Sequence, residues 1–320
     1  MRTKQLSPPV PITRTLQLAH TRLSKNLLCR LIGLATLVCS LIGMYKLGIV
    51  LWPTMERLVP DLRTRNFFIP IIGSTLIFVA INAVYLVLYV LEHPFFEQYK
   101  TNDSEWPWKT DPEFKPKLKK AAIVIFMNLI VWKPIFSGAL NFGGAANIRG
   151  KSDDIPPFHV YLLHIVFMFL SDDLFSYITH WLLHIPAVYP YFHKIHHEYF
   201  ESLSFVAEYS HPVEFIFGNL VPIGTGPLFL FGRCHMLSLM GFLLIRILAT
   251  VENHSGYDFP WAMTRLLPFQ SDSDYHDYHH LKNLGNFGST TVIWDSIFGT
   301  NTHYFEEVMK KEKELKLKTK

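Results

Sequence analysis

The sequence predicts an all-α integral membrane protein with about four transmembrane helices, a membrane hairpin and a cytosolic helical cap that holds a histidine-rich dimetal site. Three observations lead to this prediction. Hydrophobic residues make up 49% of the 320 residues and charged residues only 18%, which is too apolar for a soluble enzyme of this length. The apolar residues occur in runs long enough to cross a bilayer. Histidines gather in three short boxes within about one hundred residues.

Residues 1–30 are predicted to form a basic cytosolic N-terminal tail. They contain six lysines and arginines, no acidic residue and three closely spaced prolines. A cleaved signal peptide is not expected, because the apolar run that begins near residue 31 is too long for one.

Residues 31–120 are predicted to contain the N-terminal transmembrane helices and a loop. The first span is expected at 31–52. The second is expected at 67–91, which holds no charged residue, and a lysine-rich loop follows at 92–120. The positive-inside rule places this loop in the cytosol, together with the histidine boxes.

Residues 121–305 are predicted to form the catalytic domain. A third span at 121–140 is interrupted by Lys133-Pro134, which is expected to kink the helix or end its deep part. The short apolar run at 158–170 is expected to continue into the first histidine box as one long helix. Segments 213–231 and 236–250 are expected to enter the membrane and return as a hairpin, because histidines on both sides of it must share one site.

The histidine boxes carry the functional argument. On a helix, residues three or four apart share a face, so each box is predicted to direct all its imidazoles at one point. Eight to ten such ligands exceed the four to six that one transition metal takes, which predicts two metal ions. The boxes are His180 and His184; His193, His196 and His197; and His276, His279 and His280, with His211 and His254 lying between the second and third.

Two other interpretations of the histidines remain open. Single histidines are commonly surface or core residues, although three boxes with ligand spacing are hard to reach by coincidence. A structural or hydrolytic zinc site is the stronger alternative. Zinc takes three or four ligands and has no redox chemistry, so the excess of ligands favours redox iron.

Carboxylates near the boxes are candidates for orienting the imidazoles. Asp173 lies seven residues before His180, two helical turns away on the same face, and is predicted to accept a hydrogen bond from a ligand imidazole. An equally simple interpretation makes Asp173 part of a helix end at the membrane surface. Glu208 and Glu214 are similar candidates.

Several motifs together resemble a known family. They occur in the family's order as H-x-L-L-H, H-K-x-H-H-E, A-E-Y-x-H-P-x-E, H-S-G-Y-D-F-P-W, H-D-Y-H-H and W-D-x-I-F-G-T. Over roughly residues 120–305 the chain resembles the fatty acid hydroxylase/sterol desaturase superfamily. Within that superfamily, A-E-Y-S-H-P-V-E at 207–214 and G-N-F-G-S near 285–289 are most similar to C-4 methylsterol monooxygenases.

This resemblance implies a membrane-bound non-haem di-iron oxygenase that oxidises C-4 methyl groups of a sterol. The eight box histidines would bind two Fe ions, with His211 and His254 as further ligands or supporting groups. The enzyme would use O2 and take electrons from NAD(P)H through a reductase and cytochrome b5. The resemblance also implies a multi-pass protein of the endoplasmic reticulum membrane whose active site faces the cytosol.

The charged tail at 306–320 carries Lys316 and Lys318 at positions that resemble an endoplasmic reticulum retrieval signal, although an ordinary basic tail is an equal alternative. A net charge of +4, contributed mostly by the chain ends, gives no reason to expect nucleic-acid binding.

Three departures from the family pattern keep the substrate open. Trp181 stands where the first box commonly has arginine, Ser176 stands where the methylsterol branch often has histidine, and the stretch at 222–230 differs from that branch. The alternatives are another lipid hydroxylase or desaturase, acting on a sterol side chain, a sterol ring bond or a sphingolipid or fatty acyl chain, and a non-catalytic sterol-binding membrane protein.

Overall fold

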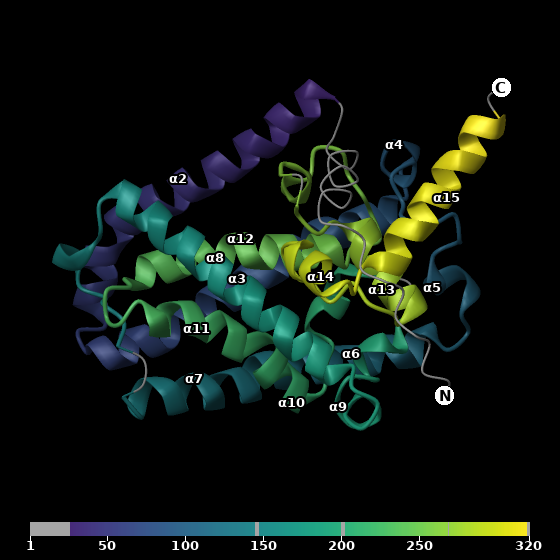
Figure 1. Cartoon of the computed structure of the whole chain (residues 1–320). Helices are drawn as coiled ribbons and strands as arrows, with labels where there is room; N and C mark the ends of the chain where they lie inside the picture. Colours follow the sequence, from purple (N-terminus) through teal and green to yellow (C-terminus); the bar gives the residue numbers. More distant parts are fainter. Residues whose placement is uncertain (1–25, 145–146, 200–201, 268, 319–320) are drawn as a thin grey trace.

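A computed structural model describes residues 26–144, 147–199, 202–267 and 269–318. Within these ranges the regular secondary structure is helical, and the only β contacts are three isolated bridges. Long helices form a bundle, and the histidine-bearing short helices gather at one end of it (Figure 1). The predicted all-α membrane fold is confirmed.

Five helical stretches are long and apolar enough to cross a membrane. Four of them match the predicted spans, and the fifth is the second arm of the predicted hairpin. They are α2 (Leu27–Leu58), α3 (Leu62–Leu91), the continuous stretch Phe114–Phe142 made of α6 (Phe114–Met127), η1 (Asn128–Trp132) and α7 (Lys133–Phe142), α8 (Phe158–Leu183), and α12 (Met236–Asn253).

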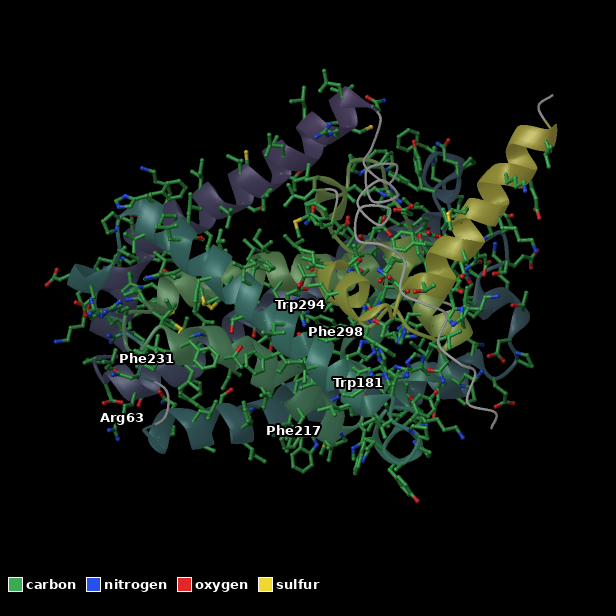
Figure 2. The ribbon with its side chains drawn as sticks, viewed as in Figure 1. Arg63, Trp181, Phe217, Phe231, Trp294 and Phe298 are labelled. Atoms are coloured by element: carbon green, nitrogen blue, oxygen red, sulfur yellow. The ribbon has the colours of Figure 1, made fainter. Side chains whose placement is uncertain are left out.

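Burial separates these helices into an outer group and a central one. In α2 only Gly33, Gly48 and Trp52 are buried along 32 residues, so this helix presents its apolar side chains outward. In α12 fourteen of 18 residues are buried, because α2, α3 and α8 all pack against it. The outer helices expose apolar side chains. In a bilayer the lipid tails can surround such side chains, so they need not be buried in protein. Figure 2 shows two aromatic examples on the outer surface, Trp181 and Phe217.

The first arm of the hairpin consists of α10 (Pro212–Glu214), η5 (Phe215–Leu220) and α11 (Val221–Phe229). It packs closely along α8, where Gly226 lies against Met168. A Cβ atom at Gly226 would come within 2.7 Å of the Met168 Cγ, so a larger residue would force the two helices apart.

The third span does not end at Lys133-Pro134, which was one of the two outcomes predicted there, a kink being the other. The helix continues to Phe142, and the five residues before Lys133 form a π-helical turn. The wider turn accommodates a proline, which lacks a hydrogen-bond donor and crowds the preceding turn. The hairpin uses the same device, because η5 is a π-helix that ends just before Pro222.

Short helices build the end of the molecule that carries the histidines. They are α4 (Pro94–Glu97), α5 (Pro107–Thr110), α9 (Tyr189–Phe192), η3 (His196–Glu198), η4 (Ser204–Glu208), η6 (Met263–Arg265), α13 (Ser273–Lys282), α14 (Ile293–Phe298) and α15 (Thr302–Lys318). A further short helix, η2 (Ser152–Asp154), contacts α2.

The structure describes only a small part of the predicted N-terminal tail but most of the predicted C-terminal tail. Most of the predicted basic tail, residues 1–25, lies outside the described residues. The remainder is helical, because Asn26 caps α2 by accepting hydrogen bonds from the backbone N–H groups of Leu28 and Cys29. The charged C-terminal tail is helical through Lys318 as part of α15.

Candidate metal centre

The three boxes reach the site from different local structures. His180 lies in the last turn of α8 and His184 caps its C-terminus. In the second box, His193 caps α9, whereas His196 and His197 lie in the 3-10 helix η3, so this box is not one α-helix. The third box lies on α13. The single His254 joins them as the C-terminal cap of α12.

Nine of the ten predicted ligands come together in two groups, in each of which the ligand atoms lie within 4.8 Å of one another. The groups touch, since the ring centroids of His197 and His280 are 4.8 Å apart. Group one consists of His180, His184, His193, His197 and His279. Group two consists of His196, His254, His276 and His280.

The prediction that each box aims all its imidazoles at one point is wrong for the second and third boxes. The two histidines of every i, i+4 pair belong to the same group. The i+3 members differ: His196 belongs to group two and His279 to group one, whereas the other histidines of their boxes belong to the opposite group. On a helix each residue advances by about 100°, so positions i+3 and i+4 diverge by that angle and can face two neighbouring points. The second and third boxes each therefore contribute to both groups.

Backbone carbonyls set the tautomer of four of these rings. The Nδ1 atom of His180 lies 2.9 Å from Phe287 O, that of His196 3.1 Å from Tyr209 O, that of His254 2.8 Å from Thr250 O, and that of His279 2.6 Å from Gly285 O. A carbonyl oxygen only accepts, so Nδ1 is the protonated nitrogen in each neutral ring. The unprotonated Nε2 atoms are then left to face the interior of the site.

The arrangement of these nitrogens fits metal ions. The Nε2 atoms of His180 and His279 are buried and have no hydrogen-bond partner among the described residues. Neighbouring Nε2 atoms approach closely, at 2.9 Å for His184 with His193 and 2.9 Å for His254 with His276. Two nitrogens bound to one ion at about 2.1 Å lie roughly 3.0–3.4 Å apart, so the observed spacing is close to that of ligands sharing an ion.

Burial keeps the rings neutral, which is the form that binds metal. It lowers the pKa of His196 to about 4 and, together with the nearby His196, that of His254 to about 3. Burial also lowers the pKa of His276, His279 and His280 well below the ordinary histidine value. Protons therefore compete weakly with a metal at neutral pH.

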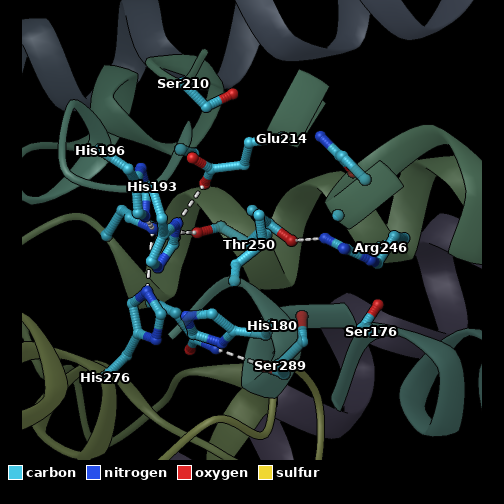
Figure 3. A pocket seen from close by; sticks show the side chains of 16 residues that line it. Ser176, His180, His193, His196, Ser210, Glu214, Arg246, Thr250, His276 and Ser289 are labelled. Atoms are coloured by element: carbon cyan, nitrogen blue, oxygen red, sulfur yellow. Dashed lines mark hydrogen bonds and ion pairs between the residues drawn. The ribbon is translucent and has the colours of Figure 1, made fainter. Parts of the chain in front are cut away.

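One carboxylate touches a group-one ring directly. Glu214 Oε1 lies 2.9 Å from His193 Nδ1, and both side chains are buried (Figure 3). Of the three predicted supporting carboxylates, Glu214 is the one that contacts an imidazole. Glu208 instead accepts a hydrogen bond from Asn219 at 3.2 Å.

Asp173 supports the site through a loop rather than through an imidazole. Its carboxylate accepts hydrogen bonds from the backbone N–H groups of Thr290 and Thr291 and from the Thr291 hydroxyl. Among the described contacts of Asp173 there is none with a histidine. The same loop carries the Phe287 carbonyl that holds His180, so Asp173 supports the first box indirectly, through this loop.

His211 is the predicted ligand that the structure places outside both groups. It caps the N-terminus of α10, where its Nδ1 accepts a hydrogen bond from the backbone N–H of Val213 at 3.2 Å. Its ring packs against Phe192. These contacts describe a helix cap.

Two neighbouring cavities lie near the histidines, and the smaller one is lined by them. A small polar cavity of about 90 Å³ is lined by His180, His193, His196, His254 and His276 (Figure 3). A mainly apolar cavity of about 710 Å³ extends from it between α3, α7, the hairpin arm and α12. Asn219, Arg246 and Thr250 line both cavities and mark their junction. Such a volume suits a lipid-sized ligand.

Comparison with known proteins agrees with this geometry. A model of the fatty acid hydroxylase family matches residues 165–300, which include all nine converging histidines. A putative methylsterol monooxygenase of Dictyostelium discoideum is 38% identical over 68% of this chain and 79% of that protein. Methylsterol monooxygenase 1 of Rattus norvegicus is 33% identical over 68% of this chain and 72% of that protein.

The chain belongs to the fatty acid hydroxylase family.

This member of the fatty acid hydroxylase family is also similar to a protein that is not named as a methylsterol monooxygenase. Very-long-chain aldehyde decarbonylase GL1-11 of Oryza sativa subsp. indica is 37% identical, but over only 47% of this chain and 56% of that protein. No solved structure gives a significant match.

Asp295 is a supporting residue of this family member that reasoning from the sequence missed. Its carboxylate accepts hydrogen bonds from the backbone N–H groups of Phe287 and Gly288, at 2.8 and 2.6 Å, and from the hydroxyls of Tyr275 and Thr300. It thereby holds the loop whose carbonyls orient the rings of His180 and His279. The motif W-D-x-I-F-G-T, which contains Asp295, was the available signal.

Proposed function

We propose that this protein is a membrane-bound di-iron oxygenase that oxidises a C-4 methyl group of a sterol. The observation that carries the proposal is the junction of two converging histidine groups with an apolar cavity of about 710 Å³ among membrane helices. The names of the Dictyostelium and rat relatives support a methylsterol as the substrate.

Each histidine group would hold one iron ion. Group one offers five imidazoles, more than the three or four ligands of an ordinary zinc site, and group two offers four. When bound, the two ions would supply the O2-dependent oxidation of an unactivated C–H bond, chemistry that amino-acid side chains lack.

Backbone carbonyls and cavity side chains position the reactants. The carbonyls of Phe287, Tyr209, Thr250 and Gly285 fix four rings with Nε2 toward the interior, as groups supporting metal ligands do. The apolar walls of the larger cavity, including Phe78, Phe215 and Leu243, bind the lipid and exclude water from it. Asn219, Arg246 and Thr250 lie where a bound lipid would meet the metals.

Electrons would come from NAD(P)H through a reductase and cytochrome b5. The electron carrier is proposed to be a separate protein. The endoplasmic reticulum membrane is the proposed location, with the histidine end of the bundle in the cytosol. The lysine-rich segment at 92–120 and the lysines at 316 and 318 support this orientation.

A sterol profile of cells with and without the protein tests the proposal. Loss of the protein is expected to cause accumulation of 4-methyl or 4,4-dimethyl sterols, measured by mass spectrometry. Restoring the wild-type chain should reverse the accumulation, whereas His196→Ala should not. Full rescue by His196→Ala would contradict the metal-dependent mechanism.

The decarbonylase relative supports a second candidate, a reaction on a long-chain aldehyde. The same mass-spectrometric experiment separates the two, because long-chain aldehydes and hydrocarbons would change while C-4 sterols remain constant. A non-catalytic sterol-binding role would leave both profiles unchanged and would require no metal in the purified protein.

A further inference from the structure

Lys133 places an ammonium group inside the membrane-spanning part of the bundle. It follows the π-helical turn η1, is 8% exposed and lines the larger cavity. A charged side chain at such a position is costly to bury, and those that occur mark binding or transport functions more often than anchoring.

The hydrogen bonds of Lys133 leave donors available to a ligand. Its Nζ donates to Thr75 Oγ1 at 2.9 Å, while the Thr75 hydroxyl donates to Ile71 O at 2.7 Å. An ammonium group has three N–H donors, and Thr75 is its hydrogen-bond acceptor among the described residues. Glu208 attracts Lys133 electrostatically without forming an ion pair with it.

Several other polar side chains of the cavity donate hydrogen bonds or form ion pairs within the protein. At the end distant from the histidines, Asn66 donates to Ile148 O and Asn141 to Arg63 O, so both amides hold backbone. At the histidine end, Arg246 forms a buried ion pair with Asp172, at 2.9 Å between Nε and Oδ2. Lys133 and Arg246 are the cations that line this cavity, and Lys133 is the one that forms no ion pair among the described residues.

Lys133 lies toward the metal end of the cavity. Five residues before it, Asn128 donates to the carbonyls of Glu208 and Ser210, and Ser210 lines the small histidine cavity. Glu208 lines the same cavity as Lys133, is near enough to attract it, and accepts a hydrogen bond from Asn219, which lines both cavities. The Lys133 side chain thus enters the apolar cavity on the side where it adjoins the histidine cavity.

We propose that Lys133 binds an oxygen atom of the lipid substrate and so orients the lipid with its polar end toward the metals. This inference rests on the proposed function and narrows the substrate class. It selects a lipid whose hydroxyl or carbonyl lies close to the carbon that is oxidised, as the 3-hydroxyl of a sterol lies beside C-4. A lipid oxidised at its apolar end would place that oxygen at the opposite end of the cavity.

Binding measurements test Lys133 separately from turnover. Purified full-length wild type, Lys133→Met and the matched control Lys46→Met are compared for equilibrium binding of a radiolabelled 4,4-dimethyl-3-hydroxysterol and its 3-deoxy analogue. Lys46 is a suitable control because it lies on the membrane helix α2, is exposed and does not line the cavity.

Wild type and Lys46→Met are expected to bind the 3-hydroxysterol roughly 10- to 100-fold more tightly than the 3-deoxy analogue, the range for a hydrogen bond to a charged group. Lys133→Met should bind both with the affinity that wild type shows for the 3-deoxy analogue. If Lys133→Met does not fold, Lys133→Ala, which only enlarges an existing cavity, provides the same comparison.

Two results would overturn the inference: retention of the 3-hydroxyl preference in the Lys133 variant, or its absence from wild type. Turnover of the same two sterols in membranes that supply electrons separates this inference from the proposed function. Sterol oxidation without any 3-hydroxyl preference would reject the role of Lys133 alone. A preference that depends on Lys133, without oxidation at C-4, would reject the proposed reaction while keeping the binding role.

Discussion

The two histidine groups use the same side chain but depend on different parts of the fold. Group one draws five rings from the three boxes and has a carboxylate, Glu214, against one of them. Group two has four rings, and one of these, His254, comes from the end of the buried helix α12. The difference indicates that group one has a spare ligand and a supporting carboxyl group, whereas group two relies on every ring and on the packed core.

The largest expected effect comes from removing one ring from each group. His276→Ala leaves group two with three imidazoles, whereas His184→Ala leaves group one with four. We expect His276→Ala to lose one metal ion per chain. Its activity should fall by more than the roughly 10- to 100-fold that follows removal of a supporting residue. His184→Ala should retain more metal than His276→Ala.

Metal content by mass spectrometry, with activity measured in the same membranes, checks this difference. His211→Ala is the matched control, since His211 lies outside both groups and should keep both metals. Equal metal loss in His184→Ala and His276→Ala would show that the groups do not bind independently.

A smaller effect is expected at the carboxylate that distinguishes group one. Glu214→Gln replaces the carboxyl group 2.9 Å from His193 Nδ1 with an amide while keeping the shape of the side chain. We expect a roughly 10- to 100-fold loss of metal affinity at group one and little change at group two. Competition with a chelator measures both affinities, with Glu113→Gln, on an exposed helix start, as the control. Equal weakening of both groups would contradict the assignment of Glu214 to group one.

Asp173→Asn should affect group one through the loop that holds His180. The amide cannot accept all three hydrogen bonds that Thr290 and Thr291 give to the carboxylate, which should cost about 1–3 kcal/mol of unfolding free energy. Thermal unfolding of the metal-free protein measures the loss. An unchanged melting temperature would show that Asp173 does not hold the loop.

Acid should destabilise the metal-free protein through histidines of both groups. This prediction therefore distinguishes the two groups less than the preceding ones do. The pKa of His196 is lowered to about 4 and that of His254 to about 3, whereas in the unfolded chain each is about 6.5. Below pH 6.5 the unfolded chain therefore binds protons that the folded chain does not. Stability should be full above pH 6.5 and fall as the pH decreases from 6.5 toward 4. Unfolding at pH 5 and 7 tests this, and His196→Ala should lose less stability on acidification than wild type.

The membrane helices could be predicted because their signal is local. Long apolar runs identify them without knowledge of their neighbours. Their burial could not be predicted, because α2 and α12 are both apolar and only tertiary packing makes one outer and the other central. The sequence did not decide whether the helix kinks or ends at Lys133-Pro134, since the π-helical turn there depends on packing rather than on an obvious sequence signal.

The metal centre could be predicted as a set of residues but not as two groups. Histidine spacing identified eight rings that do converge, and the family resemblance added His254, which joins them. The assignment of His196 and His279 to opposite groups depends on the meeting of separate helices, which spacing within one box does not describe. The role of Asp295 was hidden for the same reason, because it holds backbone N–H groups and touches no histidine in the described structure.

The position of His254 has a consequence for the life cycle of the protein. His254 lies at the end of α12, against which α2, α3 and α8 pack, so a metal ion bound by group two as proposed would be captured only after these helices have assembled. Until then the newly made chain would be incomplete. Scarcity of the metal would lengthen that interval and increase the fraction of chains exposed to cellular quality control.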